Sequence, residues 1–149
     1  MRPGARCPCQ SRKKTRRCCG PWLAGRLAPS PTALMRSRFA AYALGRADYI
    51  VATTHPDNVQ FQSDTDAWLA SIQSFSAATR FLGLRIVEAS EIDGMRATVT
   101  FHATLQQGGK DASFTEQSTF LREADGRWRY RSGIRLSAAD QASGTEAAG

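Results

Sequence analysis

The chain has 149 residues, 42% of them hydrophobic, and it carries a formal net charge of +7. This length and apolar content suit one compact domain with a core of its own and a small appendage. They exclude a helical membrane protein, because no apolar run approaches the roughly 18 residues that a spanning helix needs. The basic N-terminus lacks the apolar segment of a signal peptide, so we expect a cytoplasmic protein in a reducing environment.

Every cysteine lies near the N-terminus, in the pattern C-x-C followed after eight residues by C-C: Cys7, Cys9, Cys18 and Cys19. Four thiolates this close together can form a tetrahedral zinc site, and the cations between the two pairs favour the thiolate state. Two alternatives stay open, namely two disulfides in an oxidising compartment, or free redox thiols. A disulfide between Cys18 and Cys19 would be strained, and cysteine clusters in the cytoplasm are more typical of metal sites. The sequence therefore predicts a zinc knuckle over residues 1–22.

The segment from Cys7 to Gly20, CPCQSRKKTRRCCG, resembles the SEC-C motif C-P-C-G-S-G-K-K-[YF]-K-x-C-C-G. This motif is the small zinc tail of the SecA preprotein translocase and occurs on many uncharacterised bacterial proteins. The sequence departs from it at Gln10 and Arg12, where the motif has glycine, and at Thr15, where it has an aromatic residue. Because glycine adopts positive φ at little cost, the first two departures bear on the geometry of the loop. The resemblance implies zinc as the cofactor and the four cysteines as its ligands.

The N-terminal arm is strongly basic. Residues 1–47 contain eleven Lys or Arg and no acid, whereas the remaining residues contain nine bases and thirteen acids. Such an arm indicates contact with phosphate groups or with an acidic protein surface, and the alternative is that its cations are only solvated. The translocase tail is associated with chaperone and ribosome contacts. The resemblance therefore implies a protein or ribonucleoprotein partner in the export or translation machinery.

A linker and three helices are expected after the knuckle. Residues 23–30 are rich in Gly, Ala and Pro and predict the linker. The helices are expected over residues 33–44, over residues 47–53 and from about Asp64 onward. We expect Thr32 to cap the first helix and Gly45 to end it.

The hydrophobic period then changes to that of β-strands. Four strands are expected over residues 81–92, 95–106, 112–123 and 127–136. Asp93-Gly94, Gly108-Gly109 and Asp125-Gly126 mark the turns between them. From Ala97 to Leu105 apolar residues alternate with Thr and His, which predicts one buried face and one wetter face on which His102 lies. Three helices packed on a curved antiparallel sheet make an α+β domain over residues 31–136, and residues 137–149 predict a disordered tail.

A second resemblance concerns this domain. The stretch PTALMRSRFAAY from Pro31 to Tyr42 resembles the P-T-A-E-A-L-M-R-S-R-[YF]-x-A-[YF] block of the bacterial YchJ family. His55-Pro56 fits the family's W-H-P, with Thr54 in place of the tryptophan, and residues 116–130 match its E-x-S-x-F-x-R and G-x-W-x-Y blocks. The resemblance implies a fold similar to nuclear transport factor 2 (NTF2), a cone of helices wrapped by a bent sheet. It implies no settled activity.

Such a cone can enclose a pocket, and the candidate pocket residues are polar: Arg36, Arg38, Tyr42, His55, Glu116 and Tyr130. His55 and Glu116 are the candidate catalytic residues, as a base and its orienting group. The alternative is structural: Glu116 pairs with Arg36 or Arg38, and His55 caps a turn.

Two functional hypotheses follow. The favoured one is a zinc-binding interaction module without enzyme activity, whose basic knuckle docks on the partner described above, because no nucleophile, phosphate-binding or metalloprotease motif is present. In the alternative, the cone holds a small molecule or performs acid–base chemistry, and the knuckle is a targeting tag. An open cavity in which His55 and Glu116 converge would favour this alternative.

Overall fold

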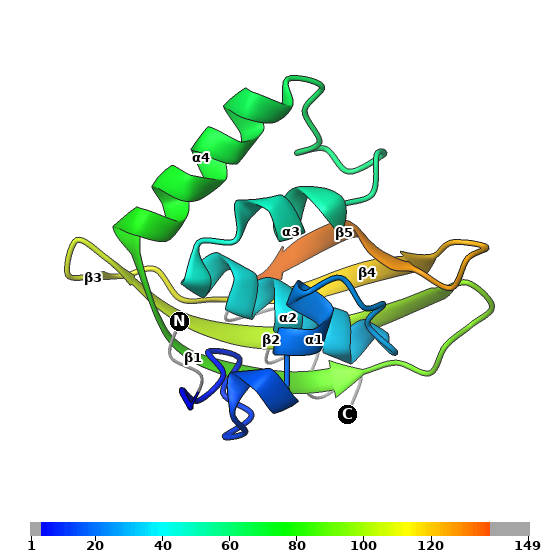
Figure 1. Cartoon of the computed structure of the whole chain (residues 1–149), viewed down its shortest axis with the longest axis horizontal. Helices are drawn as coiled ribbons and strands as arrows, with labels where there is room; N and C mark the ends of the chain where they lie inside the picture. The colour runs from blue at the N-terminus through cyan, green and yellow to red at the C-terminus, as the bar shows by residue number, and fades with distance from the viewer. Residues whose placement is uncertain (1–3, 138–149) are drawn as a thin grey trace.

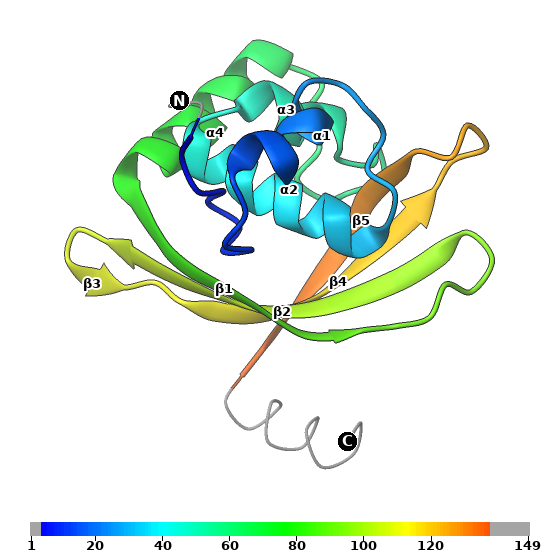
Figure 2. The same cartoon turned by 60° about the horizontal axis from the view of Figure 1, so that its bottom comes forward.

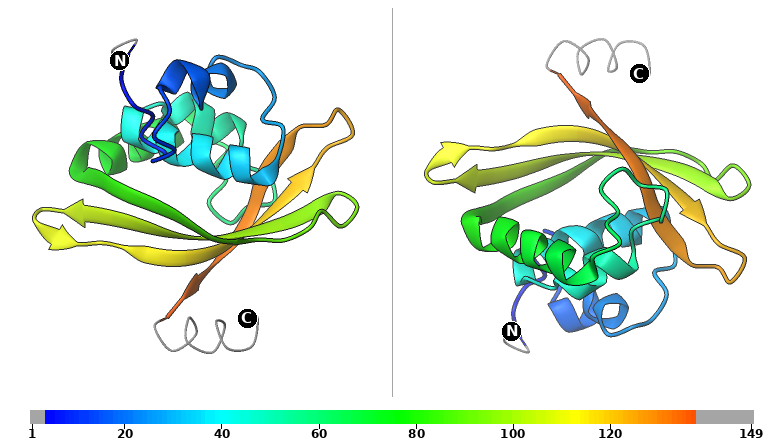
Figure 3. Two further views of the ribbon diagram at one scale, coloured as in Figure 1. Left: turned by 90° about the horizontal axis from the view of Figure 1, so that it is seen from below. Right: turned by 90° about the horizontal axis from the view of Figure 1, so that it is seen from above.

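The computed structural model describes residues 4–137 and shows helices stacked on one face of a curved antiparallel sheet (Figures 1 and 2). The N-terminal segment with the cysteines lies against the helices (Figure 3). This arrangement is the α+β cone with an N-terminal cysteine knuckle that the sequence predicts. No helix within residues 4–137 is long and apolar enough to cross a lipid bilayer. The predicted tail falls almost wholly outside the described residues.

The first long helix, α2, spans Pro31–Leu44 and begins two residues earlier than predicted. Its N-cap is Ser30 rather than Thr32, because the Ser30 hydroxyl accepts a hydrogen bond from the Ala33 amide at 3.1 Å. Pro31 then occupies the first helical position, where its missing amide and fixed φ are tolerated. Gly45 ends the helix as predicted, in a left-handed conformation with φ of 73°.

Two further helices complete the layer above the sheet. Helix α3 spans Ala47–Ala52, and α4 spans Thr65–Ala78 with the Asp64 carboxylate capping the Ala67 amide at 3.1 Å. Two short elements in the knuckle were not predicted: a 3-10 turn, η1, over Thr15–Arg17 and helix α1 over Gly20–Leu23. Both are shorter than the window over which hydrophobic periodicity can be read.

The sheet is a meander in the order β1-β2-β4-β5. Its long strands are Thr79–Ala89 (β1), Arg96–Gln107 (β2), Phe114–Arg122 (β4) and Trp128–Leu136 (β5). A two-residue strand, β3 (Lys110–Asp111), pairs with the end of β2 beyond the glycine turn. The predicted alternation on β2 is confirmed, because its apolar side chains from Ala97 to Leu105 are buried against the helices.

The buried side chains form two clusters on either side of α2. One joins α2 to the inner face of the sheet and includes Leu34, Phe39 and Phe120. The other joins the knuckle to the helices, since Cys7, Cys9 and Cys19 pack with residues of α2, α3 and α4. The knuckle is therefore part of the folded core, and the linker keeps it close to α2.

Candidate metal centre and cavity

The four cysteines converge on one point. All four Sγ atoms lie within 4.8 Å of one another, with Cys9 and Cys18 3.4 Å apart and Cys18 and Cys19 3.9 Å apart. A tetrahedral zinc ion with bonds of about 2.3 Å holds its sulfurs about 3.8 Å apart, so the cluster has the dimensions of such a site. These separations are far longer than the roughly 2.05 Å of a disulfide, and all four cysteines are free. The arrangement can hold a metal ion.

Backbone hydrogen bonds bring the two cysteine pairs together. The Cys7 amide donates to the Lys13 carbonyl at 2.8 Å, and the Thr15 amide donates to the Ala5 carbonyl at 3.0 Å. This short pairing turns the chain back on itself, and η1 then delivers the second pair beside the first. Gly20 is required directly after it, because a Cβ there would lie 2.7 Å from the Thr15 carbonyl oxygen.

The loop keeps a glycine-like backbone without its glycines. Gln10 and Arg12, which replace the two motif glycines, have φ of 69° and 71°, and they are the only non-glycine residues with positive φ among residues 4–137. A residue with a Cβ is disfavoured there by about 1–2 kcal/mol. The changed sequence therefore preserves the loop geometry at an energetic cost.

Restoring these glycines is expected to stabilise the protein. Gln10→Gly and Arg12→Gly should each raise the free energy of unfolding by about 1 kcal/mol, since the relief of positive-φ strain exceeds the extra chain entropy of glycine. Urea unfolding of the metal-loaded full chain measures this. Arg17→Gly is the matched control: Arg17 is exposed and has ordinary φ, so glycine there should destabilise slightly. Equal effects at all three positions would contradict the strain argument.

Proximity makes the thiols compete for protons. Hydrogen bonds with Cys19 and Cys7 lower the pKa of Cys9, while hydrogen bonds with Cys7 and Cys9, together with burial, raise the pKa of Cys19. A Cys19 contact lowers the pKa of Cys7, but the Cys9 contact and burial outweigh it and raise this pKa to about 11. A bound cation supplies the positive charge that lets all four ionise together.

Two polar side chains contact the cysteine cluster. The Ser11 hydroxyl lies 3.1 Å from the Cys18 sulfur, and Arg36 on α2 donates to the Cys9 carbonyl at 3.0 Å. The Arg36 guanidinium also lies 4.0 Å from the Cys9 sulfur. Arg36, predicted as a pocket residue, therefore belongs to the knuckle and fixes its position on α2.

The cone encloses a cavity of about 480 Å³ between α2, α4 and the inner face of the sheet. Nine of the residues in its walls are aromatic: Phe39, Tyr42, Trp68, Phe75, Phe81, Phe101, Phe114, Phe120 and Tyr130. Phe75 of α4 lines this cavity and is 37% exposed. Of the predicted pocket residues, Arg38, Tyr42, Glu116 and Tyr130 line the cavity, whereas Arg36 and His55 do not.

Glu116 on β4 is the polar centre of the cavity. Its Oε2 accepts hydrogen bonds from the Ser118 hydroxyl at 2.6 Å and the Tyr130 hydroxyl at 2.9 Å, and its Oε1 lies 3.7 Å from Nε of Arg135. Burial and the adjacent Glu116 charge raise the pKa of Tyr130 well above its ordinary value, so Tyr130 stays protonated and donates. The predicted pairing of Glu116 with Arg36 or Arg38 is wrong, because the partners of this carboxylate are the hydroxyls of Ser118 and Tyr130 and the guanidinium of Arg135.

Arg38 has other partners. Its Nη1 donates to the Ile50 carbonyl and to the hydroxyls of Thr53 and Thr54, at the end of α3. The guanidinium also lies 4.6 Å from the ring centroid of Tyr130. Arg38 thus joins α2, α3 and β5 and fixes the ring whose hydroxyl reaches Glu116.

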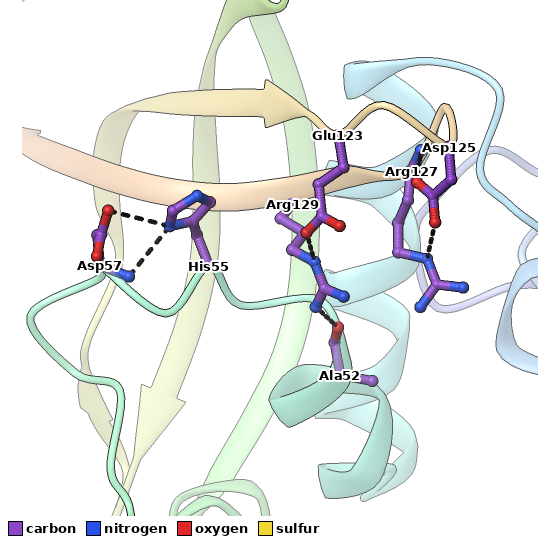
Figure 4. Close-up of polar contacts among 7 residues, drawn as sticks. All are labelled: Ala52, His55, Asp57, Glu123, Asp125, Arg127 and Arg129. Carbon is purple, nitrogen blue, oxygen red and sulfur yellow. Dashed lines mark hydrogen bonds and ion pairs between the residues drawn. The ribbon is translucent and has the colours of Figure 1, made fainter.

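His55 lies outside the cavity, on the segment between α3 and α4 (Figure 4). Its Nδ1 accepts a hydrogen bond from the Asp57 amide at 3.0 Å and lies 3.9 Å from the Asp57 carboxylate. The His55 amide donates to the Tyr130 carbonyl at 2.8 Å, so this residue holds the segment against β5. His55 therefore has the turn-capping contact of the structural alternative. Arg129 makes a similar link beside it, to Glu123 and to the Ala52 carbonyl.

Sequence reasoning missed three residues of this centre: Ser118, Arg135 and Gly133. Ser118 is 1% exposed, which alternation from Glu116 along one strand could have indicated. Gly133 faces Ser118 in the β4–β5 register and leaves the space that the Glu116 carboxylate occupies. A bulge between Thr119 and Phe120 shifts this register, and no local signal in the sequence announces it.

Comparison with known proteins agrees with this architecture. The family model described as YchJ, middle NTF2-like domain, matches residues 30–133. The chain belongs to the YchJ family. The predicted resemblance to this family and to the NTF2-like fold is thereby confirmed.

Individual YchJ-family relatives match over most of their length. A UPF0225 protein of Bordetella parapertussis is 37% identical over 132 residues, which cover 87% of this chain and 92% of that protein. The solution structure of a SEC-C motif containing protein from Rhodopseudomonas palustris is 41% identical, with a TM-score of 0.74, and covers 89% of this chain and all of that one. The crystal structure of a SEC-C motif containing protein from Psychrobacter arcticus is 25% identical, with a TM-score of 0.70, and covers 84% and 79% of the two chains. Both solved proteins are described by the SEC-C motif, which the cysteine segment of this chain resembles.

Proposed function

We propose that this protein is a zinc-binding interaction module of the cytoplasm, whose knuckle docks on an acidic protein or ribonucleoprotein surface. The observation that carries the proposal is the contrast between the buried thiols and the cations around them. Cys7, Cys9 and Cys19 are 3%, 0% and 1% exposed, so a bound ion would have no open side for chemistry. The cations Arg6, Arg12, Lys13, Arg16 and Arg17 are exposed.

Zinc is the proposed ion because the donor set is four cysteine sulfurs within 4.8 Å of one another, and four thiolates are a preferred ligand set of structural zinc. The similarity to SEC-C motif containing proteins supports the same choice. When bound, zinc would supply structural cross-linking of the knuckle. The chain itself orients the ligands, because Ser11 contacts the Cys18 sulfur and Arg36 holds the backbone of Cys9.

The exposed cations form the proposed docking surface. No Asp or Glu occurs before Asp48, so no carboxylate of the knuckle pairs with these cations, and they outnumber the two net negative charges of a zinc ion with four thiolates. A surface of one sign accelerates encounter with an oppositely charged partner and fixes its orientation, and phosphate-rich surfaces bind such patches most strongly at low salt. The charge of this surface favours an acidic or phosphate-rich partner, and the resemblance of the cysteine segment to the SEC-C motif favours one in the export or translation machinery.

The catalytic alternative is less well supported. Its candidate base, His55, does not line the cavity and is held by Asp57 and by the backbone of Tyr130. Glu116 is left in the cavity without the proposed second group. The geometry therefore favours binding over acid–base chemistry.

Neutralising the knuckle surface tests the docking proposal. The zinc-loaded full chain is compared with an Arg12→Gln, Arg16→Gln, Arg17→Gln variant in co-sedimentation with purified ribosomes and in capture by translocase complexes. We expect binding at low salt that weakens at least about tenfold in the variant. The control replaces three exposed arginines of the sheet, Arg80, Arg85 and Arg96, with Gln and should retain binding. Equal loss in both variants, or binding insensitive to salt, would overturn the proposal.

A further inference from the structure

We propose that the cavity of the cone binds an organic cation, an aromatic ligand whose protonated amine or amidine pairs with Glu116. This is a second binding function, and it does not depend on docking by the knuckle, because no knuckle residue lines the cavity. A volume of about 480 Å³ suits a ligand of two or three rings. The charge on Glu116 and the aromatic walls then set the chemistry of that ligand.

The Glu116 carboxylate can accept a hydrogen bond from a ligand in the cavity. Its side chain is only 13% exposed, and the hydroxyls of Ser118 and Tyr130 both donate to Oε2. Among residues 4–137, Oε1 has no hydrogen-bond donor, because the Arg135 Nε lies 3.7 Å away. An ionised carboxylate accepts at both oxygens, so Oε1 has capacity for a charged donor from a ligand.

The chain itself places a cation at this point. The Arg135 guanidinium lies 3.5 Å from the ring centroid of Phe114 while it faces Glu116, so a planar cation fits between an aromatic face and this carboxylate. The Arg135 side chain is 66% exposed, and exposed ion pairs of this kind are weak. A ligand cation that also fills the aromatic cavity can therefore displace Arg135.

The positive charge of Arg38 would oppose the binding of a cation, because Arg38 is buried and also lines the cavity. Its Nη1 is engaged by three acceptors of α3 and the following residues, and its guanidinium stacks on the Tyr130 ring. The hydroxyl of that same ring donates to Glu116, so Tyr130 separates Arg38 from the carboxylate. If Arg38 governed recognition instead, the cavity would prefer an organic anion.

Three probes of equal shape distinguish these cases: naphthylmethylamine, naphthylmethanol and naphthoate. Isothermal titration of each into the full chain gives the three affinities. We expect the amine to bind at least about tenfold more tightly than the alcohol, and the carboxylate to bind most weakly. The strongest binding by the carboxylate, equal binding by all three, or binding by none would overturn the proposal.

Two variants assign the preference to its residues. Glu116→Gln should reduce the affinity for the amine to that for the alcohol and leave the alcohol unchanged. Arg135→Ser removes an exposed competitor and should strengthen amine binding severalfold, whereas the exposed Arg85→Ser, outside the cavity, should not. Thermal unfolding verifies that each variant is folded. A Glu116→Gln protein that keeps the preference for the amine, or an Arg135→Ser protein that binds it no better, contradicts the role given to that residue.

Discussion

Cys18→Ser is expected to abolish tight metal binding and to lower the free energy of unfolding by on the order of 4 kcal/mol. Cys18 is the one partly exposed cysteine, so a serine hydroxyl there meets no large desolvation penalty, and the loss reports on ligation. The knuckle packs into the cluster that contains Ala40, Ala41 and Ile50. Loss of the metal should loosen the knuckle and should therefore also weaken the packing of the helices. Metal content per chain and urea unfolding with and without zinc measure the two effects.

The control for this change is Arg17→Ser, one residue away and exposed. It should retain about one metal ion per chain and nearly all of the stability. A Cys18→Ser protein that keeps its metal, or a wild-type protein whose stability a chelator leaves unchanged, would show that the cluster is not a structural metal site.

Gly133→Ala is expected to cause the second large effect. A Cβ at this position would clash with the Glu116 carboxylate and the Tyr130 hydroxyl, so the hydrogen bond between them must break or β5 must shift. Overpacking of this kind destabilises a protein by about 1–3 kcal/mol. We also expect binding of naphthylmethylamine to be lost, because the carboxylate is displaced from its place in the cavity.

Gly83→Ala is the matched control, a strand glycine on β1 at the opposite edge of the sheet. A Cβ there meets only Thr104 at an ordinary contact distance of 3.5 Å, and its backbone needs no positive φ. This variant should be as stable as the wild type or slightly more so. Similar losses in both variants would mean that alanine disturbs the sheet in general and not the Glu116 centre.

Much of the fold follows from local sequence signals. The spacing of the cysteines, the helix start near Asp64, the Gly45 stop and the alternation on β2 are signals that each act within a few residues, and each predicts its element correctly. The N-cap of the first long helix is Ser30 and not the predicted Thr32. Pro31 favours the first helical position because it has no backbone N–H that needs a partner, and this makes the preceding residue, Ser30, the cap.

The site was harder to predict because its residues meet through the register of separate elements. Glu116 and Tyr130 lie on adjacent strands, and the bulge in that pair decides which residues face each other. Charge complementarity alone suggested an arginine of α2 for Glu116. Arg36 and Arg38 instead satisfy backbone carbonyls of the knuckle and α3, which a reading of charges does not reveal.

Helix α2 is a wall shared by the two sites. On one side Arg36 and Ala40 contact the knuckle, and on the other Met35 and Phe39 line the cavity. A metal ion in the knuckle and a ligand in the cavity would therefore act on the same helix from opposite sides. Thermodynamic linkage requires that any factor by which the metal changes ligand affinity returns as the same factor in metal affinity. A metal ion in the knuckle would then change the affinity of the cavity for its ligand. A ligand in the cavity would in turn change how tightly the knuckle holds its ion.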